Sequence, residues 1–250
     1  MNDILTLITV TKDDLEGFSS TISSTRRLRE DHNVRQVVVD SSGEQTRRRV
    51  EEVLSREHNI DYVWQPPSGI AAAFNKGLSI SKADWIWFLN GKDEVLPDLD
   101  PEWFLKLIRQ CSADAIVFDL VEDGKKWKHP PLWEVWPPVV TWIPHPATLT
   151  RRSLYQKHGN FDESLKIAMD YEFWLRCFSK DVTVDMVSIP VVKFDGGGIS
   201  CVQTADTSGE SLLVMKKHLW TLVKKWLNHG SLLPRAWLHF VKRRNKGQRA

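Results

Sequence analysis

The stretch Trp85-Ile86-Trp87-Phe88-Leu89-Asn90-Gly91-Lys92-Asp93-Glu94 decides how this chain can fold. Its first five residues are bulky and apolar, which is typical of a strand buried on both faces of a sheet. Its last five are polar, so the chain must turn there. Ligands of open α/β sheets bind beyond the carboxyl ends of the strands, and a carboxylate at that point can hold a divalent cation or a sugar hydroxyl. A polar turn that merely follows a core strand is the alternative interpretation.

Upstream of this strand, apolar runs alternate with helical patterns. Strands are predicted at residues 4–10, 34–39 and 61–64, and helices at about 14–30, 45–58 and 70–81. Asp13 or Asp14 can cap the first helix. Strand–helix alternation at these lengths predicts a parallel sheet with right-handed crossovers.

Downstream, the pattern is less regular. Further helices are predicted at 102–111, 151–158 and 170–179, and strands at 115–120 and 182–194, with Gly159 closing the 151–158 helix. Residues 122–146 read as a long irregular loop, rich in tryptophan and proline, and long loops inside a domain are usually functional. Residues 211–229 form an amphipathic pattern, and 232–241 a second apolar segment before the basic end.

Charge is distributed unevenly along the 250 residues. The segment 211–250 holds ten Lys and Arg residues and no acid, which leaves 24 basic against 32 acidic residues elsewhere, a formal −8. A basic amphipathic tail on an acidic body predicts contact with an anionic membrane surface. RNA is the other anionic partner, but no nucleic-acid motif accompanies the tail, so we expect no nucleic acid.

Cysteines and apolar runs indicate the compartment. Cys111, Cys177 and Cys201 are odd in number and lack C-x-x-C spacing, which predicts reduced thiols in a cytoplasmic protein. The run at residues 4–10 follows Asp3 and no basic region, so it reads as a first strand and not as a signal peptide. No apolar run reaches 18 residues, so no spanning segment is expected, and any membrane contact would be peripheral at the inner face.

Four blocks of the sequence together resemble a known family. They are Val38-Val39-Asp40-Ser41-Ser42-Gly43, Gly69-Ile70-Ala71-Ala72-Ala73-Phe74-Asn75-Lys76-Gly77, Phe88-Leu89-Asn90-Gly91-Lys92-Asp93, and Gly159-Asn160-Phe161-Asp162-Glu163 followed by Asp170-Tyr171-Glu172-Phe173-Trp174-Leu175-Arg176. In order and spacing, over about residues 4–200, the chain is similar to the inverting family-2 glycosyltransferases. The resemblance implies a GT-A fold, a Rossmann-like, mostly parallel sheet flanked by helices, here with C-terminal amphipathic helices.

The resemblance also implies donor-binding residues. Thr9 and Thr11 would border the nucleobase, and Asp40 would hydrogen-bond the base or the ribose. Asn75 and Lys76 match the helix beside the donor.

The turn after the central strand completes the implied donor site. Asn90 and Lys92 would contact the donor, and Asp93 matches the second acid of the family's D-x-D-like signature, which grips a Mn²⁺ or Mg²⁺ ion. Such an ion would neutralise the leaving diphosphate.

The acceptor side is implied in the same way. Asp170 matches the catalytic base that takes the acceptor hydroxyl's proton, so that one direct displacement inverts the anomeric carbon. His145 and Glu172 match positions near the acceptor, and the loop 196–200 matches a segment that closes over the site.

Two positions depart from the family pattern. Members commonly carry Asp-Asp where this chain has Lys92-Asp93, and an acid where Ala72 stands. Lys92 would then either pair with the diphosphate, in a transferase that uses little metal, or mark a donor site that has decayed.

We therefore predict a GT-A glycosyltransferase domain at residues 1–205 and a basic amphipathic helical tail at 206–250. The predicted reaction moves a sugar from a nucleotide-sugar donor to a glycan or lipid-linked acceptor, as in polysaccharide biosynthesis. The alternative is a non-catalytic GT-A-like protein that binds a glycan or a partner transferase.

Overall fold

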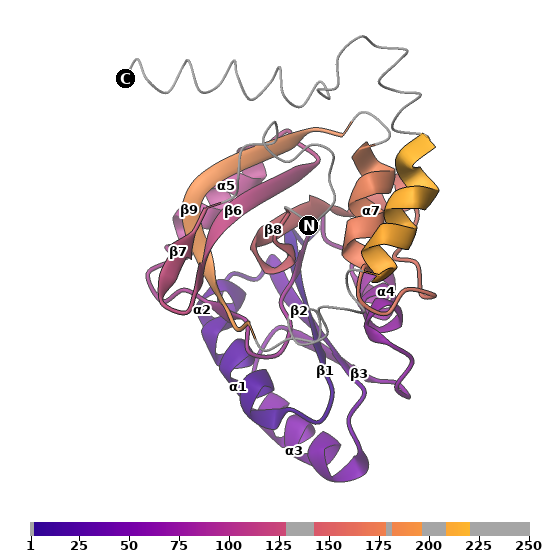
Figure 1. Ribbon diagram of the computed structural model, residues 1–250. Helices are drawn as coiled ribbons and strands as arrows, with labels where there is room; N and C mark the ends of the chain where they lie inside the picture. The colour runs from indigo at the N-terminus through magenta and orange to yellow at the C-terminus, as the bar shows by residue number, and fades with distance from the viewer. Residues whose placement is uncertain (1–2, 129–142, 179–181, 197–208, 221–250) are drawn as a thin grey trace.

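The computed structural model describes residues 3–128, 143–178, 182–196 and 209–220 (Figure 1). Its centre is a nine-stranded mixed sheet with strands in the order β3-β2-β1-β4-β8-β6-β9-β5, and β7 pairs with β6. The strands are β1 (Leu5–Thr11), β2 (Val34–Asp40), β3 (Ile60–Trp64), β4 (Trp85–Phe88), β5 (Glu94–Val95), β6 (Ala115–Glu122), β7 (Lys125–Trp127), β8 (Thr148–Arg151) and β9 (Val184–Phe194).

The amino-terminal half of the sheet is parallel, as the strand–helix alternation predicts. β1 pairs in parallel with both β2 and β4, and β2 pairs in parallel with β3. β4 is fully buried, and both of its indole N–H groups have hydrogen-bond partners. Trp85 donates to the carbonyl of Ile108, and Trp87 donates to the carbonyl of Pro146. Burial on both faces explains why this strand reads as a continuous apolar run.

The carboxyl-terminal half is mixed, so "mostly parallel" describes only the first half of the sheet. β8 runs antiparallel between β4 and β6, and β9 runs parallel to β6 and antiparallel to β5. β8 was not predicted from the sequence, because its four residues, Thr-Leu-Thr-Arg, carry only one large apolar side chain. β7, a short hairpin strand inside the predicted loop 122–146, was not predicted either. Residues 129–142 of that loop lie outside the described part.

Helices flank the sheet. They are α1 (Leu15–Ser24), α2 (Arg26–Arg29), α3 (Glu44–Leu54), α4 (Ile70–Ile80), α5 (Pro101–Gln110), the 3-10 turn η2 (His145–Ala147), α6 (Arg152–His158) and α7 (Met169–Phe178). The predicted helix 14–30 is divided at Thr25, whose buried hydroxyl bonds the carbonyl of Ile22 and the side chain of Gln36 on β2. Asp14 caps α1 through the amide of Gly17, and Gly159, at φ 84°, ends α6.

Two apolar clusters lie on opposite faces of the sheet, because successive side chains of a strand alternate between faces. One contains Trp85 and Trp87 with residues of α5, and the other contains Ile86 and Phe88 with residues of α4, α6 and α7. The sheet therefore sits between two helical layers (Figure 1).

Residues 209–220, in the predicted tail 206–250, form a helix beside α7 (Figure 1). Val214 is 2% exposed and packs with Ala168, Tyr171 and Leu175. Residues 221–250 lie outside the described part. Among the described helices, none combines the length and apolar character that crossing a bilayer requires.

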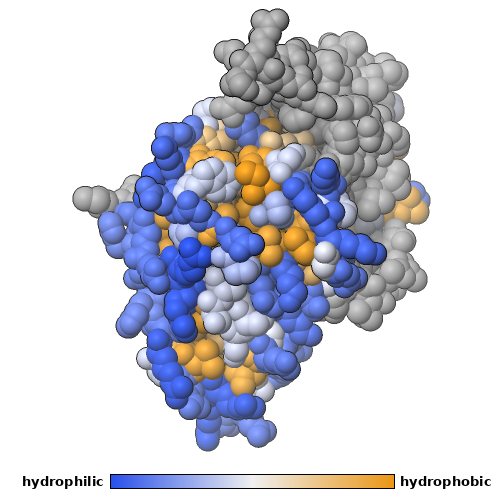
Figure 2. Space-filling model, turned by 90° about the vertical axis from the view of Figure 1, so that its left-hand side faces the viewer, coloured by the Kyte–Doolittle hydropathy of each residue, from blue (hydrophilic) through white to orange (hydrophobic). Residues whose placement is uncertain are grey.

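Polar residues dominate the face that carries α5, β9 and α1, with small apolar areas between them (Figure 2).

Candidate active site

The carboxyl ends of β1, β2 and β4 meet at one edge of the sheet. Thr11 is in register with Asp40, and the amide of Ser41 donates to the Thr11 carbonyl. The amide of Leu89 donates to the carbonyl of Ile8 on β1, which brings the polar turn after β4 to the same edge. The topology thus gathers Thr11, Asp40 and the Asn90–Asp93 turn, as the sequence predicts.

The side chain of Asp40 organises its own loop. It is fully buried, accepts a hydrogen bond from the amide of Ser42 at 2.8 Å, and accepts another from the Tyr62 hydroxyl at 3.1 Å. Burial is the main cause of a raised pKa of Tyr62, and the negative charge of Asp40 is the second cause. Asp40 is therefore placed at the predicted edge, with both carboxylate oxygens already bonded within the protein.

The two predicted threonines differ in their surroundings. The Thr9 hydroxyl is buried and accepts a hydrogen bond from Gln36 at 2.9 Å, in the network that also holds Thr25. The Thr11 hydroxyl is buried without a hydrogen-bond partner among the described residues. Of the two, Thr11 has the free hydrogen-bonding capacity that a ligand could use.

The Asn90–Asp93 turn rests on α1. The Asn90 carbonyl accepts from the Thr21 hydroxyl, and the Lys92 amide donates to the Gly17 carbonyl at 3.0 Å. A Cβ at Gly17 would lie 2.3 Å from the Lys92 Cγ, so only glycine permits this approach. Lys92 itself has φ 79°, a left-handed conformation that costs a non-glycine residue about 1 kcal/mol or more.

Asp93 is the most enclosed acid of this turn, at 3% exposure. Its Oδ2 accepts from the Asn90 amide at 2.9 Å, while the side-chain oxygen of Asn90 is buried without a partner among the described residues. Burial, reinforced by the charge of Asp195, raises the pKa of Asp93 to about 7. A cation beside this carboxyl would favour its ionised form.

Lys92 sits between two carboxylates. Its ammonium lies 3.8 Å from Asp14 and 3.9 Å from Asp195, and its side chain is half exposed. Asp195, at the end of β9, was not predicted as a site residue. The sequence feature that could have identified it is an acid directly before Gly196-Gly197-Gly198. No group of three potential metal-ligating side chains occurs in the described ranges. The carboxylates near a cation would be Asp93 and Asp195.

Asn75 and Lys76 on α4 have different surroundings. The Asn75 side chain exchanges hydrogen bonds with the backbone of Phe161, at 3.0 Å in each direction, and donates to Glu163 at 2.8 Å. Asn75 thus fixes the loop that leads into α7, and this contact occupies the amide that was predicted to bind the donor. Lys76 is exposed.

Asp170 lies in the first turn of α7. It is half-buried, and burial raises its pKa to about 6, although the amide of Tyr171 donates to its Oδ1 at 2.7 Å. A carboxylate that titrates near 6 is ionised at neutral pH and is a better proton acceptor than an ordinary aspartate.

His145 lies in an aromatic cluster between Phe74, Phe88 and Phe161, with ring centroids 5.1, 5.1 and 6.0 Å away. Its Nε2 has no hydrogen-bond partner among the described residues, and burial lowers its pKa to about 4. His145 is therefore neutral at physiological pH.

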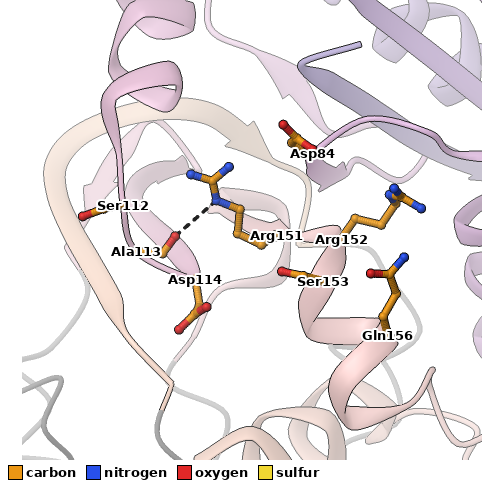
Figure 3. A pocket seen from close by; sticks show the side chains of 8 residues that line it. All are labelled: Asp84, Ser112, Ala113, Asp114, Arg151, Arg152, Ser153 and Gln156. Carbon is orange, nitrogen blue, oxygen red and sulfur yellow. Dashed lines mark hydrogen bonds between the residues drawn. The ribbon is translucent and has the colours of Figure 1, made fainter. Parts of the chain in front are cut away.

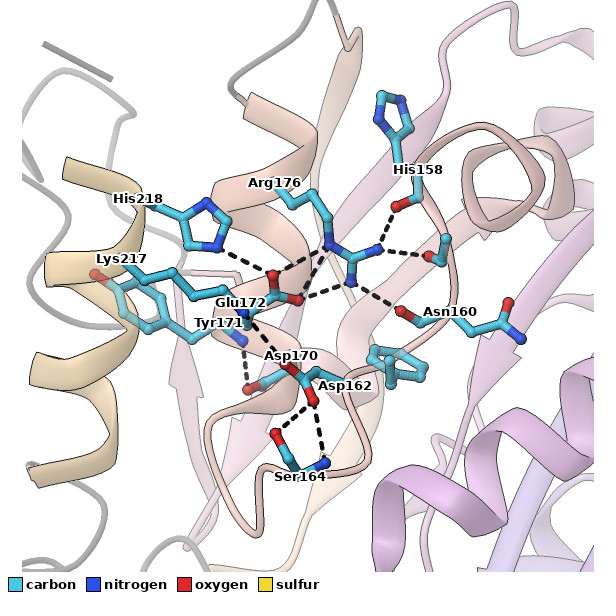
Figure 4. A network of polar contacts seen from close by, with 12 residues as sticks. His158, Asn160, Asp162, Ser164, Asp170, Tyr171, Glu172, Arg176, Lys217 and His218 are labelled. Atoms are coloured by element: carbon cyan, nitrogen blue, oxygen red, sulfur yellow. Dashed lines mark hydrogen bonds and ion pairs between the residues drawn. The ribbon is translucent and has the colours of Figure 1, made fainter. Parts of the chain in front are cut away.

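Glu172 belongs to a polar network (Figure 4). Its carboxylate bonds Arg176 at 2.7 Å and His218 at 3.0 Å, and Arg176 donates to the carbonyls of Gly159 and Asn160. Although burial opposes it, these partners lower the pKa of Glu172. The predicted acceptor residue is thus engaged in linking α7 to the α6 end and to the 209–220 helix.

A cavity of about 370 Å³ lies elsewhere (Figure 3). It opens around Asp84, just before β4, and around Arg151 and Arg152 at the end of β8, so it lies at the opposite end of β4 from the polar turn. Arg151 donates to the carbonyl of Ala113 and stacks on Trp85 at 4.1 Å, which commits this guanidinium to the fold.

Comparisons with known proteins identify the family of this chain. The model of the family "Glycosyl transferase family 2" matches residues 6–171. Two relatives from Mycobacterium tuberculosis, the uncharacterized glycosyltransferases MT1564 (strain CDC 1551) and Rv1514c (strain H37Rv), are each 27% identical over 210 residues, covering 78% of this chain and 76% of each relative.

Solved structures show the same fold. The S. aureus TarS fragment 1–349 superposes with a TM-score of 0.66 at 16% identity, covering 88% of this chain and 65% of the fragment. The same fragment in complex with UDP-GlcNAc gives a TM-score of 0.65 at 17% identity, covering 88% and 66%. This chain therefore spans about two thirds of the TarS fragment.

The fold is that of the GT-A glycosyltransferases. The chain belongs to glycosyl transferase family 2, as the resemblance implied.

Proposed function

We propose that this protein transfers a sugar from a nucleotide-sugar donor to a hydroxyl of a glycan or lipid-linked acceptor, with inversion. The observation that carries the proposal is Asp170, a half-buried carboxyl with its pKa raised to about 6, in a chain of this family. Complexes of TarS with UDP and with UDP-GlcNAc support a nucleotide-sugar donor. Asp170 takes the proton of the acceptor hydroxyl as that oxygen attacks the anomeric carbon.

The donor binds at the strand edge. Thr11 and Asn90 offer buried oxygens that lack partners among the described residues, and Asp40 shapes the loop beside them. Asp93, with Asp195 nearby, fits a Mn²⁺ or Mg²⁺ ion whose other ligands come from water and diphosphate oxygens. When bound, the ion neutralises the charge of the leaving diphosphate. The Lys92 ammonium lies 3.8 Å from Asp14 and 3.9 Å from Asp195, at the same edge of the sheet as Asp93.

A thermal-shift panel of UDP-, GDP- and dTDP-sugars, with and without manganese, tests donor binding. Asp93→Ala should abolish manganese-dependent stabilisation, whereas Asp98→Ala, at an exposed acid nearby, should not. Lys92→Asp, the common family pattern, should keep or strengthen the metal dependence. If no nucleotide stabilises the folded wild type, the alternative of a non-catalytic glycan- or partner-binding protein is the better one.

We further propose that the C-terminal segment places the enzyme on an anionic membrane surface. On the 209–220 helix, Leu213 and Trp220 are 66% and 69% exposed, and Lys216 lies between them in the sequence. The ten basic residues of 211–250 supply the charge. Deleting 221–250 keeps the packed helix and should reduce sedimentation with phosphatidylserine vesicles. Equal sedimentation with neutral vesicles would contradict the electrostatic part.

A further inference from the structure

The backbone directly before α7 is held by a residue that is distant in the sequence. Ala168 accepts the first helical hydrogen bond, from the Glu172 amide at 2.9 Å, so it occupies the position where a Ser, Thr, Asp or Asn usually caps the helix. An alanine side chain cannot accept hydrogen bonds. The amides of residues 166–168, directly before the helix, are bonded by an acceptor from elsewhere in the chain.

Glu210, more than forty residues away in the sequence, is that acceptor. Its Oε1 accepts from the amide of Lys166 at 2.9 Å, and its Oε2 accepts from Ile167 at 2.7 Å and from Ala168 at 2.6 Å. Despite burial, these bonds lower the pKa of Glu210, so it is ionised at neutral pH. A carboxylate at a helix N-terminus is also favoured by the helix dipole.

The same helix holds α7 at two further points. Val214 is buried in the cluster of Ala168, Tyr171 and Leu175, and His218 bonds Glu172 at 3.0 Å (Figure 4). The contacts with Glu210, Val214 and His218 span two turns of the 209–220 helix. The amides that Glu210 holds lie two to four residues before Asp170.

We propose that the 209–220 helix is a brace for α7 and that Glu210 is a positioning residue for Asp170. This inference rests on the proposed function of Asp170 as the base. In this role Glu210 acts through the backbone directly before α7, which leads to the Asp170 carboxylate. A small displacement of a reacting group costs much of the rate, so loosening this turn lowers turnover without weakening donor binding.

The test compares wild type, Glu210→Gln, Glu210→Ala and the control Lys106→Gln, which neutralises an exposed charge on α5. Glu210→Ala should speed hydrogen exchange of the amides at 166–168 and lower kcat at least about tenfold, with the donor Kd unchanged. Gln retains one acceptor oxygen and should give an intermediate effect. Lys106→Gln should match wild type in each measurement.

A second readout does not require turnover. The Asp170 carboxyl, followed by NMR titration, should move from a pKa of about 6 toward its ordinary value in Glu210→Ala, because the loosened turn admits water. Unchanged exchange at 166–168 overturns the brace. If exchange is faster but kcat is unchanged, the positioning role is overturned. If no turnover can be measured, faster exchange with an unchanged Asp170 pKa overturns it. If wild type binds no nucleotide sugar, the proposed function fails, while exchange and titration still decide the inference.

Discussion

Replacing Asp170 with asparagine should lower activity and raise stability together. Asparagine retains the oxygen that accepts from the Tyr171 amide, but it cannot take a proton. Loss of a general base costs about 10²-fold or more in transfer rate. The donor Kd should stay unchanged, because the proposed donor site lies at the strand edge.

The stability gain follows from the raised pKa. The Asp170 carboxyl has a pKa of about 6 in the folded protein and an ordinary pKa of 3.8, a difference that corresponds to a cost of about 3 kcal/mol for the ionised form. Because this half-buried group is screened by solvent, the cost is reduced to about 1–2 kcal/mol. Because the folded protein binds the proton more tightly, the cost is absent below pH 4 and is complete above pH 6. Asp170→Asn should therefore be more stable than wild type at pH 8 and equal to it at pH 4.

Urea unfolding at pH 4, 6 and 8, beside nucleoside diphosphate release in a transfer assay, measures both effects. The wild-type rate should rise with pH through about 6, with roughly nine-tenths of Asp170 ionised at pH 7. Wild-type transfer rates in the asparagine variant would refute the base. A stability gap that does not widen with pH would refute the buried, raised-pKa carboxyl.

Three further substitutions test the fold. Glu57→Gln should lower the free energy of unfolding in urea by about 3–5 kcal/mol, because it leaves the charge of Arg29, whose side chain is 2% exposed, without its carboxylate partner. The control Glu51→Gln breaks an exposed ion pair and should cost less than about 1 kcal/mol. Equal losses in the two variants would contradict the argument. Gly77→Ala should cost about 1–3 kcal/mol in the same assay, since its Cβ would lie 2.5 Å from a side-chain carbon of β1; full stability would show that the sheet yields there. Cys111 should resist iodoacetamide at pH 8 until the protein unfolds, because burial raises its pKa to about 11, and labelling of the native protein would show otherwise.

The parallel half of the sheet was predictable because its signals are local. A continuous apolar run such as Trp85–Leu89 has few other ways to be buried, and strand–helix alternation fixes the crossovers. β8 was not predictable, because its position between β4 and β6 is set by pairing partners distant in sequence. The placement of Asp93 at a strand end followed from the same local logic.

The other site residues depend on contacts that no local pattern encodes. The sequence predicts Lys92 as a donor contact, but it does not predict that Asp14 and Asp195, from opposite ends of the domain, lie 3.8 and 3.9 Å from its ammonium. Asn75 reads as a donor ligand, yet its amide is complementary to the backbone of Phe161. The contact of Glu210 with the amides before α7 could not be predicted, because a glutamate on an amphipathic helix is expected to face solvent.

The position of β8 also has a consequence during synthesis. When β4 leaves the ribosome, only the edge that pairs with β1 has a partner. Its other edge stays unpaired until β8 is synthesised, about 60 residues later. At about 5–20 residues per second, the nascent chain presents the unpaired edge of Trp-Ile-Trp-Phe for about 3–12 s. An unpaired apolar edge is a template for association between chains. Slow translation between these two strands would therefore favour aggregates, and a chaperone that shields this edge would raise the yield of folded protein.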